Sequence, residues 1–180
     1  PVVMKAVRRN LRATFSSLEV RNFRLFFVGQ MVSVSGTWMQ MIGQSWLVLN
    51  LTGSPAALGI VTAAQFLPLL FFGPYAGVLA DRYDKRKILL ATQTVSLVLA
   101  LVLGVIVASG VVQLWMVIAL AGSLGISTAF DSPSRQSFFL EMVGPDKVAN
   151  ALTLNSVTMN VGRLFGPAIW EVRSLDQILA

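Results

Sequence analysis

An aspartate and an arginine lie one helical turn apart within an otherwise apolar part of this sequence. Polar residues recur there at intervals of four: Ser123, Ser127, Asp131 and Arg135. That spacing places all four on one face of a helix, which Pro133 is able to bend. Charged side chains are costly inside a membrane, so they are candidates for ion or substrate handling. The alternative is an intrahelical ion pair that only fixes packing.

Two further observations concern these charges. If the helix ends near Phe139, Asp131 lies roughly 12 Å inside that end at 1.5 Å per residue. Arg163, in a later apolar segment, is a third candidate for an intramembrane charge and is expected to face protein or water rather than lipid.

A second polar face is predicted nearer the N-terminus. Its members follow each other at steps of three and four: Gln30, Ser33, Thr37, Gln40 and Gln44. Neutral polar side chains inside a bilayer either line a water-filled cavity or bind neighbouring helices, and both alternatives stay open here. Gly29, Gly36 and Gly43 run beside this face, and Gly73 and Gly77 form a small-xxx-small pair. Small residues at such spacing favour close helix packing.

The composition requires a membrane around these helices. Hydrophobic residues make up 55% of the 180 residues and charged residues 12%, against about 25% charged in soluble domains. No charge occurs over residues 25–80 or 88–130. One span needs about 20 residues, so each run holds two spans and a turn.

Several classes of chemistry are excluded by the residue types. The sequence has no cysteine and no histidine, which removes disulfides, zinc sites built on thiolate or imidazole, and Ser-His triads. We expect no enzyme, no catalytic residue, no metal and no cofactor. The net charge of +6 sits in clusters between apolar runs, so we expect no nucleic-acid partner either.

Turn-forming residues divide the apolar runs. Gly, Pro, Asn and Ser concentrate at 50–55, 109–110 and 144–146. We therefore predict an all-α polytopic membrane protein with about five transmembrane helices, over residues 23–49, 55–80, 87–108, 112–139 and 147–169. Residues 1–22 precede this bundle (23–169), as an amphipathic surface helix or a solvated tail, and residues 170–180 follow it as a divergent tail. Lys and Arg cluster before residue 25 and in 82–87 and are absent from the turns at 50–55 and 109–113, so the N-terminus is expected to be cytoplasmic.

The sharpest motif is the charged stretch 77–87, Gly-Val-Leu-Ala-Asp-Arg-Tyr-Asp-Lys-Arg-Lys. Its basic residues alone would be ordinary membrane anchors, but its two acidic residues are not explained by that rule. The stretch resembles the loop between helices 2 and 3 of the major facilitator superfamily, G-x-L-A-D-R-x-G-R-[RK]-[RK]. The matching residues are Gly77, Leu79, Asp81, Arg82, Arg86 and Lys87. Asp84 replaces the usual second glycine, as it commonly does in the drug and siderophore exporter branch.

Further likeness to that branch extends over roughly residues 21–169. It is carried by the segments 21–25, 36–40, 51–55, 130–136, 155–156 and 166–167. The resemblance implies a secondary transporter of the bacterial inner membrane that exports drugs or siderophore-like small molecules with protons as the coupling ion. It also implies that Asp81 docks against the opposite half of the transporter, and that Arg86 joins a charge network with Asp131.

The resemblance implies six helices in a complete half, whereas five are predicted here. We expect an N-terminal fragment that does not transport alone and that requires a C-terminal half or another chain. The charged residues of 170–180 leave no room for a sixth apolar span of about 20 residues. The alternative class is a membrane scaffold or assembly subunit that transports nothing.

Overall fold

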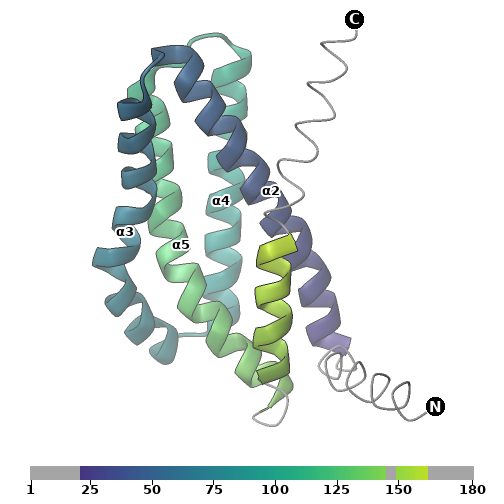
Figure 1. The fold of residues 1–180 in the computed structure, drawn as a ribbon. Helices are drawn as coiled ribbons and strands as arrows, with labels where there is room; N and C mark the ends of the chain where they lie inside the picture. The colour runs from purple at the N-terminus through teal and green to yellow at the C-terminus, as the bar shows by residue number, and fades with distance from the viewer. Residues whose placement is uncertain (1–20, 145–148, 162–180) are drawn as a thin grey trace, which may run out of the picture. The chain divides into compact units, whose positions relative to one another are not determined.

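The computed structural model describes residues 21–144 and 149–161, and these residues are helical apart from short connections. Four labelled helices follow one another: α2 (Arg21–Thr52), α3 (Pro55–Arg82), α4 (Lys85–Ala108) and α5 (Leu114–Val143). A further helix occupies residues 149–161 (Figure 1). The all-α fold is confirmed, and the helix ends that the structure describes differ from the predicted ones by about one turn or less.

Three of the described helices are long and apolar enough to cross a membrane, namely α3, α4 and α5. The α2 helix is long enough, with 32 residues. Its polar face lowers its mean hydropathy, so α2 is not among the helices that are apolar enough to cross a membrane. The fifth predicted span, 147–169, is described only over residues 149–161. The chain is therefore a polytopic membrane protein by the length and composition of its helices.

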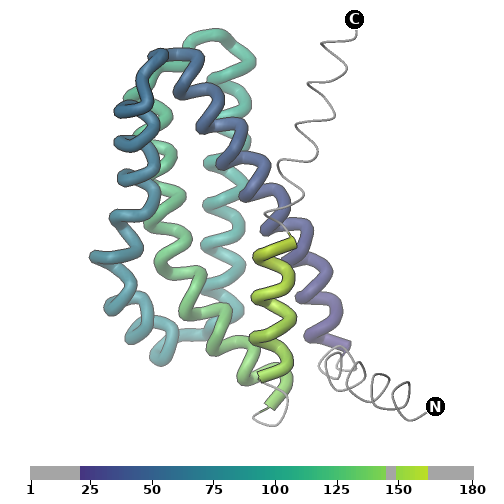
Figure 2. Tube along the Cα trace, in the orientation of Figure 1, coloured from purple at the N-terminus to yellow at the C-terminus, as the bar shows by residue number. Residues whose placement is uncertain are grey.

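The chain divides into two compact units. The central unit, residues 43–138, contains the last turns of α2, all of α3 and α4, and most of α5. The terminal unit contains, among the described residues, 21–42, 139–144 and 149–161. Figure 2 follows the path of the chain through both units.

Short polar connections in the central unit end each helix where the sequence predicts a turn. Gly53 and Gly110 both have positive φ, at 60° and 72°, a conformation that glycine adopts without steric cost. Ser54 caps α3 by accepting a hydrogen bond from the Ala57 amide, and Pro55 occupies the first turn, where its missing N–H costs nothing. These residues fix the α2–α3 and α4–α5 turns.

The core of the central unit lies beside those turns. Its buried residues come from all four helices of the unit: Val48, Ala57, Val61, Leu103, Val117 and Ala121. Larger apolar side chains of α3, among them Leu70, Phe71 and Tyr75, are exposed. Outward apolar side chains are the expected surface of helices that face lipid.

The terminal unit has its own aromatic core. Phe23, Phe139, Ala151 and Leu154 are buried together. The rings of Phe23 and Phe139 meet edge to face at 5.6 Å between centroids, which is a favourable aromatic geometry. This contact holds the first turn of α2 to the last turns of α5.

Close helix packing occurs at a different glycine from those predicted. A Cβ atom at Gly125 of α5 would overlap the backbone carbonyl of Gln65 of α3, lying 2.9 Å from its carbon. By contrast, a Cβ at Gly73 or Gly77 would meet nothing within 4 Å, and the same holds for the three glycines beside the polar face of α2. The prediction that the Gly73–Gly77 pair marks close packing is therefore wrong for the part of the chain that the structure describes.

Candidate functional site

Asp131 lies deeper in its helix than the sequence predicted. The α5 helix continues to Val143 rather than ending near Phe139, which places Asp131 roughly 18 Å from the helix end at 1.5 Å per residue. Its side chain is buried, with an exposed fraction of 8%, and that of the Arg135 side chain is 11%. Both ionisable groups are thus removed from solvent within an apolar helix.

Three donors surround the Asp131 carboxylate. Arg135 forms an ion pair with Oδ2. Thr92 donates its hydroxyl to Oδ1 at 2.8 Å, and the Gln93 side-chain amide donates to the same oxygen at 3.2 Å. An ionised carboxylate accepts hydrogen bonds at both oxygens, so this arrangement suits the charged form.

Hydroxyl groups extend the polar contact between α4 and α5. Ser127 donates to the backbone carbonyl of Thr92 at 3.0 Å, and its oxygen lies 3.3 Å from that of Ser96. Ser123, the first member of the predicted polar run, is exposed and bonds to the Ala119 carbonyl within its own helix. The predicted run therefore reaches the α4 interface only from Ser127 onward.

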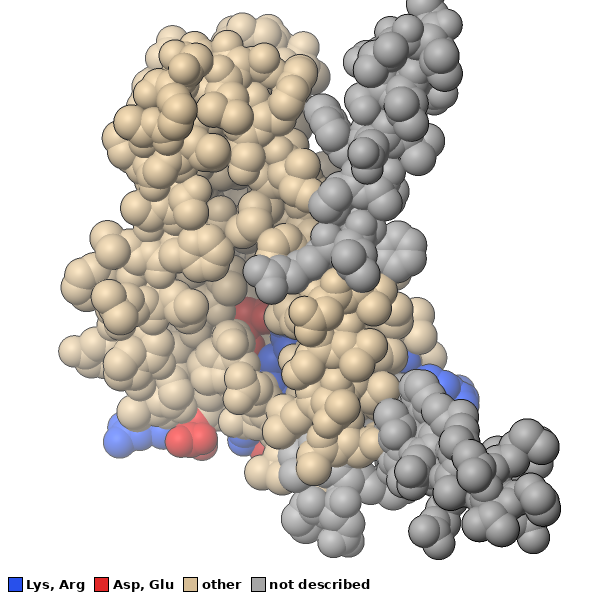
Figure 3. Space-filling model, in the orientation of Figure 1, with Lys and Arg blue, Asp and Glu red and all other residues tan. Residues whose placement is uncertain are grey.

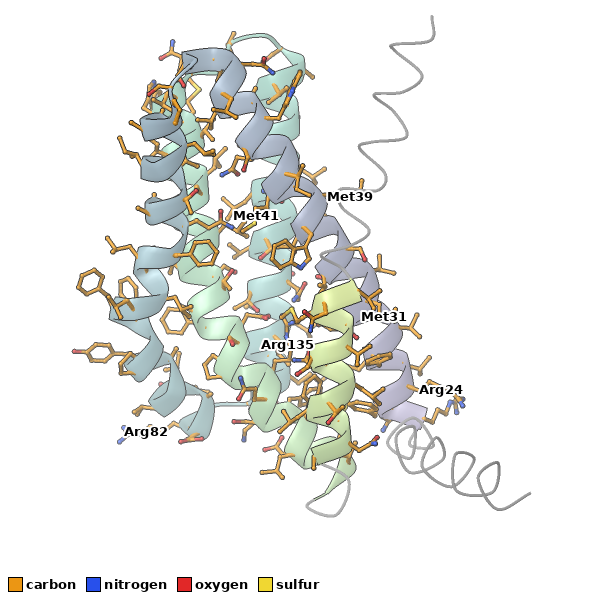
Figure 4. All side chains as sticks on the ribbon, in the orientation of Figure 1. Arg24, Met31, Met39, Met41, Arg82 and Arg135 are labelled. Carbon is orange, nitrogen blue, oxygen red and sulfur yellow. The ribbon has the colours of Figure 1, made fainter. Side chains whose placement is uncertain are left out.

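One nitrogen of the Arg135 guanidinium, Nε, differs from the nitrogen that pairs with Asp131. Its Nε atom is buried and has no hydrogen-bond partner among the described residues. A buried donor without a partner is costly, and more so on a charged group. Figure 4 shows Arg135 among the helices, whereas Arg82 points outward at the end of α3.

The charged motif spans the end of α3, the short connection and the first turn of α4. Asp84 caps α4, because its carboxylate accepts from the amides of Arg86 and Lys87 at 2.9 and 3.4 Å. Asp81 and Arg82 are exposed in the last turn of α3. On the face drawn in Figure 3, red and blue atoms gather at this end of the molecule, a second red and blue group lies farther inside, and the rest of α3 carries no charge.

The remaining motif positions have simpler surroundings. The Leu79 carbonyl accepts the Tyr83 amide at the end of α3, at 3.1 Å. Gly77 has open space beside it. The side chain of Arg86 is exposed and does not pair with Asp131 in this structure. The docking and network roles that the resemblance implies for this motif stay predictions.

The polar face of α2 is buried unevenly. Gln30 in the terminal unit and Gln44 in the central unit are buried, Ser33 and Gln40 are half-buried, and Thr37 is exposed. The Thr37 hydroxyl bonds to the Ser33 carbonyl at 3.0 Å. The Gln30 amide nitrogen, Nε2, is buried without a partner among the described residues. A role in lining a cavity stays a prediction.

Several predictions fall outside the described residues. They concern Arg163, the segment 1–20 and the tail 170–180. No group of three carboxylates that could hold a metal ion occurs within residues 21–144 and 149–161.

Thr92 and Gln93 are the site residues that sequence reasoning missed. Both lie within the apolar helix α4, where a threonine and a glutamine side by side were the available signal. Their importance follows from their contacts with Asp131, thirty-nine and thirty-eight residues away in sequence.

Ionisable residues inside apolar membrane helices are typical of proteins that move ions or substrates, and secondary transporters are among these proteins. Residues 12–172 match the family model described as transmembrane secretion effector, within the major facilitator superfamily. The chain belongs to this family, which is one of transporters rather than enzymes.

Curated relatives agree with that assignment. The chain is 30% identical over 147 residues to the staphyloferrin A transporter of Staphylococcus aureus, a match that covers 81% of this chain and 37% of that protein. It is 25% identical over 162 residues to macrolide efflux protein A of Streptococcus pyogenes, covering 88% of this chain and 40% of the relative. A shorter match, 29% identical over 72 residues, covers 40% of this chain and 17% of the multidrug efflux pump Tap of Mycobacterium bovis.

The matched region is thus about two-fifths of the length of the first two relatives. No solved structure shows significant similarity to the chain.

Proposed function

We propose that this chain forms part of a proton-coupled secondary exporter of drugs or siderophore-like small molecules. The observation that carries the proposal is the buried ion pair of Asp131 and Arg135, which α4 completes with two neutral donors. The relatives named for staphyloferrin A, macrolides and multidrug efflux support the substrate class.

Protonation of Asp131 is the proposed coupling step. A neutral carboxylic acid no longer forms an ion pair with Arg135, and it becomes a hydrogen-bond donor itself. The contacts between α4 and α5 must then rearrange, because three donors face a group that has gained a proton. Such a change can bias one of the two conformations that alternating access requires.

The proposed location is the bacterial inner membrane, with the N-terminus cytoplasmic. The connection between α3 and α4 carries the basic residues, and the turns at 53–54 and 109–113 carry none. In this orientation the motif from Gly77 to Lys87 would act as a gate at the cytoplasmic face. The buried members of the α2 polar face, Gln30 and Gln44, would contribute to the substrate cavity.

Two residues of similar exposure, one at each end of α4, allow this orientation to be tested. Val111 is 58% exposed and Tyr83 is 62% exposed, on opposite ends of α4. We expect Val111→Cys to react with a membrane-impermeant maleimide in intact cells, and Tyr83→Cys to react only after the membrane is opened. The chain itself contributes no background, because it has no cysteine. Reaction of Tyr83→Cys in intact cells would reverse the orientation.

The proposed function is tested with inverted membrane vesicles that contain the complete gene product. An inside-acidic pH gradient should drive saturable uptake of labelled macrolides, cationic drugs or siderophores, because protons leaving the vesicle would be exchanged for the compound. A protonophore should abolish uptake, and vesicles without the protein provide the control. Absence of gradient-dependent uptake across that panel would contradict the proposal.

A further inference from the structure

The Thr92 hydroxyl has two acceptors within reach. Its oxygen lies 2.8 Å from Oδ1 of Asp131 and 3.1 Å from the backbone carbonyl oxygen of Leu89. A hydroxyl has one proton, so it donates fully to only one of the two acceptors at a time. When it donates to Leu89, its lone pairs are free to accept a hydrogen bond from a protonated Asp131.

The position of Thr92 is fixed from two directions. Its side chain contacts Asp131, and its backbone carbonyl accepts the Ser127 hydroxyl at 3.0 Å. Both contacts join α4 to α5, and Thr92 is buried. The hydroxyl can therefore reverse its direction by rotating its proton, with no movement of either helix.

Gln93 differs from Thr92 in this respect. The nitrogen of its side-chain amide, which faces Oδ1 at 3.2 Å, is a donor only. It stabilises the ionised carboxylate and opposes a proton on that oxygen. The two neighbours thus act together on the charged form, but only Thr92 is able to serve both forms.

We propose that Thr92 and Gln93 are positioning residues that hold Asp131 against Arg135 and set the pH at which transport responds to protons. The Thr92 hydroxyl donates to the ionised carboxylate and turns toward Leu89 when the carboxylate is protonated. This inference rests on the proposed function for its effect on transport. Its effect on Asp131 itself can be measured separately.

The charged groups around Asp131 are the same in the wild type and in the variants proposed below. Arg135 lies on the same helix and is common to every variant below. On α4, Lys85, Arg86 and Lys87 occupy the first turn, and Thr92 follows the last of these by roughly 8 Å along the axis. On α3, the charged residues of the helix, Asp81 and Arg82, are exposed at its end. Substitution of a neutral residue leaves all of these charges in place.

The test compares Thr92→Val with Thr92→Ser and with a control on the same helix. Thr94→Val is the matched control, because the exposed Thr94 donates its hydroxyl to the Leu90 carbonyl of its own helix, at 2.7 Å. The first measurement is an infrared pH titration of the purified complete gene product, in which the Asp131 carboxyl band is assigned by its loss in Asp131→Asn. The second is the pH profile of gradient-driven uptake.

We expect Thr92→Val to raise the midpoint of both titrations by about one pH unit, because a lost hydrogen bond to the charged form favours the protonated form. Thr92→Ser should restore the wild-type midpoint, and Thr94→Val should leave it unchanged. Gln93→Leu should also raise the midpoint, and it provides a second variant if Thr92→Val does not fold.

Equal infrared midpoints in wild type, Thr92→Val and Gln93→Leu would overturn the inference, as would the same shift in Thr94→Val. A shifted infrared midpoint with an unshifted transport profile would refute the link to transport. Failure of the proposed function gives a different result, since the infrared shift would persist in a protein that shows no gradient-driven uptake.

Discussion

Replacement of Arg135 by methionine should lower the free energy of unfolding of the complete gene product by about 3 to 5 kcal/mol. The reason is the buried Asp131 carboxylate, whose ionic partner is removed while its charge remains in an apolar surrounding. Methionine keeps much of the side-chain length, so loss of packing contributes little. Unfolding by SDS in mixed micelles, followed by tryptophan fluorescence, measures the change.

A double variant separates loss of the pair from loss of one partner. Asp131→Asn combined with Arg135→Met removes both charges, and it should be more stable than Arg135→Met alone, because no uncompensated charge is left buried. Gln136→Met, at the exposed neighbouring position, is the control and should change stability little. A single variant no less stable than the double variant would show that Asp131 is not held as a buried anion.

Replacement of Gly125 by alanine should cost about 1 to 3 kcal/mol of stability and should separate α3 from α5. The new methyl group would overlap the backbone carbonyl of Gln65, which cannot move as a side chain can. Gly122→Ala is a matched control on the same helix. There the added Cβ would lie 3.7 Å from the Ala64 carbonyl oxygen, an ordinary contact distance.

The same SDS titration, applied to both glycine variants, decides this second prediction. A stability loss in Gly125→Ala that clearly exceeds that in Gly122→Ala supports the close contact between α3 and α5. If both variants unfold at the wild-type concentration of SDS, these two helices are not in contact at Gly125 in the membrane protein.

The helices were predictable because their ends are encoded locally. Glycine with positive φ and a serine followed by proline stop one helix and start the next, whatever the tertiary structure. The least accurate end was that of α5, predicted at 139 and observed at Val143. Its polar last turns were excluded from a membrane span, but a helix can continue beyond the membrane.

The site was predictable only where its contacts stay within one helix. The pair of Asp131 and Arg135 follows from a spacing of four. The contributions of Thr92 and Gln93 depend on the rotation and register of α4 against α5, which no local pattern specifies. The close packing at Gly125 could not be predicted for the same reason, because it depends on a backbone carbonyl of α3 rather than on the neighbours of Gly125 in sequence.

We propose that Asp131 couples proton movement to export, and Asp131→Asn tests this role most directly. Asparagine keeps the shape and the hydrogen-bonding capacity of the neutral acid but carries no titratable proton. The measurement is uptake of a transported compound into inverted vesicles, with and without a pH gradient. We predict that Asp131→Asn loses gradient-driven accumulation and keeps downhill equilibration of the compound. Accumulation by Asp131→Asn with the wild-type pH profile would contradict the claim.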